Sequence, residues 1–206
     1  MVRIILALIF LFAPSQIWAF GVQQGISGAV AGGGGSCDTV VWSNTTAGTS
    51  DFDINDNEFY YIVGNRVTPA SETTVCKVDF YISYKAGDIS GKTFRAFIYT
   101  TSVDALNSGT EADSTVSGNN SWSDSSNSTG TVVSFEWSGG YTMSGSTEYA
   151  IVVRMDGAAD TSNYAELEYS TSTAFPGGET IGRWTSDGTY QGGAVDSQAK
   201  MVVYEN

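Results

Sequence analysis

Histidine is absent from this chain of 206 residues, and basic residues are scarce, with 9 Lys and Arg against 22 Asp and Glu. Without an imidazole, the chain cannot use Ser-His-Asp or Cys-His catalysis, nor bind zinc through histidine. Its formal net charge of −13 leaves no basic surface to displace counterions from phosphates. We therefore expect no nucleic-acid partner and none of these reactions.

Long apolar runs are also lacking, apart from one at the N-terminus. Arg3 is followed by an apolar stretch over residues 4–13, and Ile17 and Ala19 suit the positions that a signal peptidase reads. The stretch is too short to span a bilayer, which needs about 20 residues. We predict a signal peptide over residues 1–19, a secreted protein, and no membrane span once that peptide is removed.

Residues 20–36 are rich in glycine and include an unbroken run from Gly32 to Gly35. Glycine loses more backbone entropy on ordering than any other residue, so this segment is interpreted as a flexible linker. In an alternative interpretation, Val22, Ile26 and Val30 belong to an extension that docks on a neighbouring subunit. The protein would then be a homo-oligomer.

Cysteine occurs only at Cys37 and Cys76. After export the two thiols would meet an oxidising environment, where a disulfide could stabilise the fold by about 3–4 kcal/mol. Alternatively, Cys76 is an ordinary buried side chain, because it lies on the apolar phase of a strand pattern. The sequence leaves both interpretations open, since it does not show whether the two Cβ atoms meet.

From residue 37 onward, apolar side chains recur with a period of two. Over residues 74–84, one face carries Cys76, Val78, Phe80, Ile82 and Tyr84. The alternation also marks strands at 93–101, 131–137, 148–155 and 164–169, and less clearly at 39–42, 58–63, 181–185 and 200–204. About nine short strands joined by turns predict an all-β fold, an antiparallel two-sheet β-sandwich of jelly-roll type. We assign residues 37–206 to this single domain.

Oxygen ligands are densest in the acidic segment 51–58. Asp51, Asp53, Asn55 and Asn57 occupy alternate positions, and their carboxylate and amide oxygens suit a hard cation such as calcium. The alternatives are a charged surface loop or a strand edge guarded by carboxylates. Calcium would brace the sandwich rather than take part in chemistry, and we expect no organic or redox cofactor.

Two carboxylates, Glu166 and Glu168, share one face of a predicted strand, about 7 Å apart by the rise per residue. A glycoside hydrolase needs two carboxylates that flank the sugar. On an antiparallel strand, however, such side chains ordinarily form the solvated face of the sheet. Since no environment that would raise a carboxyl pKa is recognisable, we expect a protein that is not an enzyme.

Aromatic side chains outside the core pattern are the remaining candidates for binding. Four lie opposite the core phase of their strands: Tyr81, Phe97, Tyr99 and Tyr164. Flat rings beside polar groups can stack on a sugar while its hydroxyls form hydrogen bonds. Rings at strand ends or in loops suit a ligand best, and we select Trp122, Tyr141, Trp184 and Tyr190. The alternative is that these rings are buried, with Trp122 folding back onto the core.

Short stretches of sequence carry a family resemblance: VGNRVTP at 63–69, VCKV at 75–78, GKTF at 91–94 and STEYAI at 146–151. They resemble a loose group of bacterial and phage-associated extracellular jelly-roll modules, some of which are similar to carbohydrate-binding domains. The resemblance covers most of residues 58–206. It implies a binding or display role at a cell or particle surface and carries over no site residue.

These observations favour a secreted, non-catalytic recognition module that binds an extracellular glycan or mediates surface adhesion. One alternative is a structural subunit of a cell-surface or virion apparatus, which assembles through its glycine-rich N-terminal arm. The other alternative is a glycoside hydrolase.

Overall fold

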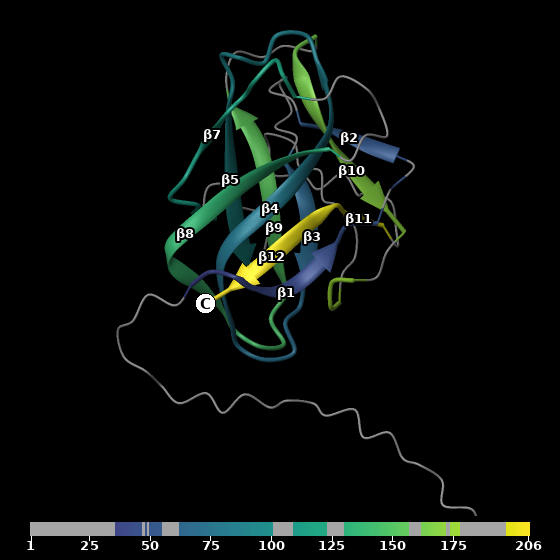
Figure 1. Ribbon diagram of the computed structural model, residues 1–206. Helices are drawn as coiled ribbons and strands as arrows, with labels where there is room; N and C mark the ends of the chain where they lie inside the picture. The colour runs from purple at the N-terminus through teal and green to yellow at the C-terminus, as the bar shows by residue number, and fades with distance from the viewer. Residues whose placement is uncertain are drawn as a thin grey trace, which may run out of the picture. The chain divides into compact units, whose positions relative to one another are not determined.

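The strands of this protein are arranged in two antiparallel sheets, which Figure 1 shows one behind the other. In this computed structural model the described residues are 36–46, 48, 50–54, 62–100, 109–122, 130–156, 162–171, 174–177 and 197–206. They lie in one compact unit, Gly34–Asn206. The predicted signal peptide and all but the last residue of the predicted linker are outside the described residues.

One sheet has seven strands and the other has five. The seven-stranded sheet contains β1 (Thr39–Asn44), β2 (Ser50–Ile54), β4 (Thr73–Ala86), β8 (Thr131–Met143), β10 (Tyr164–Ser170), β11 (Gln198–Ala199) and β12 (Met201–Glu205). The five-stranded sheet contains β3 (Val63–Val67), β5 (Thr93–Thr100), β6 (Thr110–Glu111), β7 (Val116–Ser117) and β9 (Tyr149–Asp156).

The core lies between the two sheets and is built from the inward-facing side chains of both. Phe80 of β4 packs edge-on against Phe135 of β8, with ring centroids 5.9 Å apart. Phe94 of β5 and Ile151 of β9 enter the same core from the other sheet, and both are fully buried. Each such side chain contributes about 1.5–3 kcal/mol on burial, so this core is the main source of stability.

The outer side of the five-stranded sheet is buried as well. Phe97 and Tyr99 of β5 form a second apolar cluster with Ala150 and Val152 of β9 and with Ile62. The sequence pattern of residues 148–155, which is apolar on both faces, predicts a central strand, and β9 does lie between β3 and β5. This sheet therefore has no row of exposed rings on the strands where the sequence places Phe97 and Tyr99.

The seven-stranded sheet forks along one edge of β4. β12 pairs with β4 over residues 75–80, and β10 pairs with it over residues 82–86. Lys200 lies where the two strands meet: its N–H donates to the Glu168 carbonyl at 2.8 Å, and its carbonyl accepts from the Tyr81 N–H at 3.2 Å. The backbone of Lys200 thus joins both branches of the fork to each other.

Two buried amides satisfy the backbone beside this fork. Asn65 reaches across from β3, donates to the Ala199 carbonyl at 3.1 Å and accepts from the Ala199 N–H at 2.6 Å. Asn44, at the end of β1, donates to the carbonyls of Gln198 and Ala199 at 2.9 and 3.3 Å. A buried backbone group without a hydrogen bond would cost about 1–3 kcal/mol. By bonding to these backbone groups, the two amides avoid that cost where the fork is buried.

The two-sheet antiparallel sandwich expected from the sequence is confirmed, whereas the jelly-roll order of its strands stays a prediction. The strands predicted at 39–42, 74–84, 93–101, 131–137, 148–155, 164–169 and 200–204 are all present. The predicted strand at 181–185 and most of 58–63 lie outside the described residues. The sequence pattern does not predict β2, β6, β7 or β11, and the predicted strand at 58–63 shares only Val63 with β3. Segments as short as these show little or no alternation.

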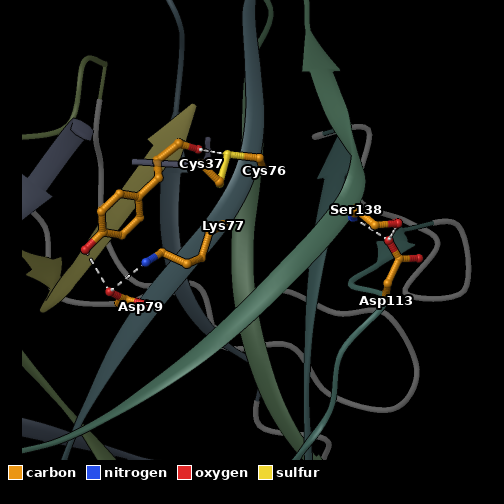
Figure 2. Close-up of a disulfide and its surroundings, with 7 residues drawn as sticks. Cys37, Cys76, Lys77, Asp79, Asp113 and Ser138 are labelled. Atoms are coloured by element: carbon orange, nitrogen blue, oxygen red, sulfur yellow. Dashed lines mark hydrogen bonds and ion pairs between the residues drawn. A yellow bond between two sulfur atoms is a disulfide. The ribbon is translucent and has the colours of Figure 1, made fainter. Parts of the chain in front are cut away.

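A disulfide joins Cys37, just before β1, to Cys76 in β4, with the two Cα atoms 5.9 Å apart (Figure 2). The predicted disulfide is therefore confirmed, and the alternative of a free buried thiol at Cys76 is wrong. The Cys76 Sγ also lies 3.4 Å from the Tyr204 carbonyl oxygen, and Thr39 pairs with Glu205. The start of β1 and the end of β12 are thus held together beside β4.

We expect the double variant Cys37→Ser/Cys76→Ser to fold with a free energy of unfolding lower by about 3–4 kcal/mol, because the unfolded chain gains the entropy of an open loop. Denaturant unfolding measures this difference. As a control, a reducing agent should lower the midpoint of the parent protein and leave that of the double variant unchanged. Equal midpoints for the two oxidised proteins would contradict the expectation.

Candidate functional site

The rings selected from the sequence do not form one exposed surface. Trp122 is buried and packs on Phe94 with ring centroids 5.0 Å apart, so its selection as a ligand-stacking residue is wrong and the alternative of a core ring holds. Tyr141 of β8 is partly buried against the core and contacts Tyr149 edge-on at 6.1 Å. Trp184 and Tyr190 lie outside the described residues.

Half-buried tyrosines instead line the outer face of the seven-stranded sheet, along β4. We call this set the tyrosine row, and it consists of Tyr204 on β12, Tyr81 and Tyr84 on β4, and Tyr164 on β10. None of these rings belongs to the apolar core between the sheets. Tyr81 and Tyr164 lie opposite the core phase, as the sequence predicts, whereas Tyr84 and Tyr204 are additions that only the structure provides.

Tyr84 is on the outer face because β4 contains a bulge. Ile82 pairs with Leu167, but the next paired residue of β4 is Tyr84, opposite Glu166, so one extra residue is inserted at Ser83. The Ser83 hydroxyl is buried and donates to the Glu166 carbonyl at 3.2 Å. A bulge reverses the alternation beyond it, so the sequence-based placement of Tyr84 on the core face is wrong.

At one end of the row, polar contacts fix the ring of Tyr204. Its hydroxyl donates to Asp79 Oδ2 at 2.8 Å, and the Lys77 ammonium lies 3.9 Å from the ring centroid (Figure 2). The Ser134 hydroxyl donates to Asp79 Oδ1 at 2.6 Å, so both carboxylate oxygens are occupied. The pKa of Tyr204 is raised to about 12, mainly because the phenol is buried. The hydrogen bond that it donates to Asp79 and the negative charge of that carboxylate raise the pKa further.

In the middle of the row, Tyr81 lies beside the fork. The Lys200 ammonium is 5.5 Å from the centroid of the Tyr81 ring and 3.0 Å from Glu168 Oε2. The other carboxylate oxygen, Glu168 Oε1, accepts from the Gly48 N–H at 2.6 Å. Lys200 and Glu168 are both almost fully buried, so they hold the sheet together here and are not free to bind a ligand.

At the other end, Tyr84 and Tyr164 form a tilted pair with ring centroids 6.3 Å apart. Glu166 pairs with Tyr84 on one side and with Asp53 of β2 on the other. Burial, followed by the charges of Glu166 and Asp53, raises the pKa of Tyr164. This end of the row therefore combines the two rings with the carboxylates of Glu166 and Asp53, which lie beside them on β10 and β2.

The two candidate glycosidase carboxylates have different surroundings. The expectation that both lie on a solvated strand face is wrong for Glu168, because the fork and Gly48 cover it and Lys200 neutralises it. Glu166 is half-buried on the outer face. Glu168 in this arrangement has a structural partner for each oxygen, so it is not available as a nucleophile or base.

The predicted calcium segment begins as a strand. Asp51 and Asp53 lie in β2, opposite Glu168 and Glu166 of β10, which agrees with the alternative of a strand edge carrying carboxylates. Asn55 and Asn57 are outside the described residues. In the part of the chain that the structure describes, no three Cys, Asp or Glu side chains converge as metal ligands would. Calcium at this segment stays a prediction.

The tyrosine row offers flat apolar rings and fixed hydrogen-bonding groups on one face. Tyrosine loses little conformational entropy when it binds, and each hydroxyl can donate or accept a hydrogen bond. Exposed Val132, opposite Tyr81, and exposed Val40, opposite Tyr204, extend the apolar area at both sides. Such a face can bind a flat, hydroxyl-rich ligand by stacking and hydrogen bonding.

No protein-family model matches the chain, and comparison with curated proteins finds no similar sequence. Among the described residues, no helix is long and apolar enough to cross a membrane.

Among the tyrosines that the structure describes, Tyr204 and Tyr99 should ionise late in an alkaline titration followed by phenolate absorbance, because each has a pKa of about 12. Tyr204→Phe should remove one of them, and Asp79→Asn should lower the pKa of Tyr204. Since the ordinary pKa is 10.0, the stability that Tyr204 confers is complete below pH 10 and is lost as the pH rises through about 12. An unchanged late phase in Tyr204→Phe would contradict this assignment.

Glu168→Gln and Lys200→Met should each lower the free energy of unfolding by about 3–5 kcal/mol, because either change leaves one buried charge without its partner. The double variant should recover most of that loss, since it buries no charge. A double-mutant cycle on denaturant unfolding measures the coupling. Additive losses would show that the ion pair does not hold the fork.

Proposed function

We propose that this protein is a secreted, non-catalytic recognition module that binds an extracellular carbohydrate along the tyrosine row. The observation that carries the proposal is the alignment of Tyr204, Tyr81 and Tyr84 along the outer face of β4, with Tyr164 beside the last of them. Stacking of half-exposed rings on the apolar faces of sugar rings provides affinity, and neighbouring polar groups provide orientation.

The length of the row favours an oligosaccharide over a single sugar. Lys77, which pairs with Tyr204, and Tyr84 are seven positions apart in β4. Because Ser83 is the extra residue of the bulge, six steps of about 3.3 Å separate these positions along the strand, and the row extends for about 20 Å. A chain of sugars lying along β4 could therefore contact several rings at once, which raises affinity without any deep pocket.

The polar groups of the row favour a neutral ligand. Asp79, Glu166 and Asp53 place negative charge along it, and the Lys200 charge is already paired with Glu168. The whole chain carries a net charge of −13, so it repels polyanions in general. Neutral glycan hydroxyls, by contrast, can donate to a carboxylate such as that of Glu166, which is half-buried on the outer face.

The compartment is part of the same proposal. The predicted signal peptide over residues 1–19 directs export, and the Cys37–Cys76 disulfide is of the kind that persists in oxidising surroundings. A glycan or another surface component outside the cytoplasm is then the partner, and no cofactor takes part in binding.

A glycan array, followed by calorimetry on the best neutral oligosaccharide, tests the proposal. Tyr84→Ala should weaken binding about tenfold, because a lost ring contact costs about 0.5–1.5 kcal/mol together with its buried area, whereas Tyr84→Phe should bind nearly as well as the parent. Tyr141→Ala is the matched control, since that ring packs against the core, away from the row. Equal affinities for parent and Tyr84→Ala would remove the row as the binding face.

Repeating the array with calcium and with a chelator separates ligand binding from the predicted metal segment, since no residue of the row needs the ion. Deletion of residues 20–36 tests the alternative of a structural subunit. Concentration-dependent assembly that disappears with this deletion, together with no binding on the array, would favour that alternative.

A further inference from the structure

The long strand β8 lies at an edge of the seven-stranded sheet. Within the described residues it forms a ladder only with β4, over residues 131–136 and 141–143. The N–H and carbonyl groups of Val132, Ser134 and Glu136 therefore point away from β4, as alternation in an antiparallel pair requires. An edge of this kind is a template on which another strand can pair.

The second half of this edge is closed by Asp113 and Ser114. The Asp113 N–H donates to the Glu136 carbonyl at 2.8 Å, and the Ser114 hydroxyl accepts from the Glu136 N–H at 2.8 Å. Asp113 Oδ2 accepts from the N–H and the hydroxyl of Ser138, at 2.6 and 2.7 Å (Figure 2). Together these two residues give the edge the hydrogen bonds that a neighbouring strand would give.

These residues come from the other sheet. Asp113 and Ser114 lie in the connection between β6 and β7, and each of these two-residue strands pairs with β5. The Trp137 indole N–H also donates to the Thr110 carbonyl at 3.3 Å, which holds β6, just before the connection, against β8. The connection thus spans from the five-stranded sheet to the edge of the seven-stranded one.

The first half of the edge has no such cover among the described residues. Val132 is 48% exposed, and the segment Thr131–Phe135 carries no charge and is rich in β-branched and aromatic residues. These are the properties of an edge that pairs with another chain. No backbone partner of Val132 or Ser134 is found in the described part of the chain.

We propose that Asp113 and Ser114 form an autoinhibitory bracket, which keeps the β8 edge from pairing with the β8 edge of a second copy of this chain. An edge pairs antiparallel with itself about a two-fold axis, so the second copy is a self-complementary partner. Centred on Ser134, such a pair sets Glu136 of each copy opposite Val132 of the other, so the two carboxylates do not face each other. The bracket occupies the N–H and carbonyl of Glu136 that this pairing requires.

The Asp113 carboxylate also supplies a charge at the edge. Hydrogen bonds from Ser138 lower its pKa, so it is ionised at neutral pH. A charged side chain at the edge opposes pairing between copies. Removing it takes away this repulsion, frees the Ser138 N–H, and removes the two hydrogen bonds by which the Asp113 side chain anchors the bracket on β8. The bracket and the tyrosine row are separate, because one lies at an edge of the sheet and the other on its outer face.

Light scattering in line with size-exclusion chromatography, on the full chain over a range of concentrations, tests the proposal. We expect the parent to elute as a monomer and Asp113→Ala to show an approximately twofold higher mass that falls on dilution. Asp88→Ala is the matched control, because Asp88 accepts the same pair of hydrogen bonds from Ser90, at 3.0 and 2.7 Å, but in a turn. It should remain a monomer.

A rescue variant excludes simple unfolding as the cause. Adding Val132→Lys to Asp113→Ala should return the mass to that of the monomer, because a lysine on the open half of the edge blocks pairing. Circular dichroism should show the same strand content in all variants. A monomeric, folded Asp113→Ala, or a dimer that persists with Val132→Lys, would overturn the proposal. Both readouts are independent of whether a glycan binds the row.

Discussion

The turn at Lys200 is the constraint on which the rest of the structure depends. It allows two strands, β10 and β12, to share one edge of β4, although neither is long enough to cover that edge alone. The backbone of Lys200 bonds to both branches, its ammonium neutralises Glu168, and Asn65 satisfies the adjacent peptide from the opposite sheet. The tyrosine row exists only because the fork places Tyr204 and Tyr164 beside the same strand.

The two sheets differ in how they use their outer sides. On the five-stranded sheet, Phe97 is buried, and the Arg154 guanidinium covers its ring at 4.6 Å while pairing with Asp156. The outer face of the Phe97 ring is thus covered by another side chain of the same sheet. On the seven-stranded sheet, the rings of the row remain half-exposed, and the Tyr204 hydroxyl donates to its neighbour Asp79 on the same face. This asymmetry determines which face can meet a ligand.

The face and the edge of the seven-stranded sheet offer different chemical groups: side chains on the face and backbone groups at the edge. On the face, contacts such as the Tyr204–Asp79 hydrogen bond and the Tyr84–Tyr164 pair restrict the rings, which lowers the conformational entropy they would lose on binding. The β8 edge, by contrast, exposes backbone groups that any strand could pair with, and a short connection from the other sheet occupies part of them. The proposed binding face therefore depends on side-chain rings, whereas the proposed pairing edge depends on backbone groups of β8.

The sequence by itself determined the class of fold, because the alternation of apolar side chains depends only on neighbours in the chain. It placed Phe80 and Ile151 in the core, and it identified Cys37 and Cys76 as a pair able to form a disulfide. Only the tertiary structure decided which carboxylates and rings are available. The bulge at Ser83 turned Tyr84 outward.

The burial of Trp122 and the ion pair of Glu168 likewise depend on residues from distant parts of the chain. Lys200 neutralised Glu168, and Trp122 was buried against Phe94. A period of two distinguishes the two faces of a strand, but it does not show which strand lies beside it, where the register slips, or which face is covered. Those features depend on contacts between residues far apart in sequence, and such contacts exist only once the chain has folded.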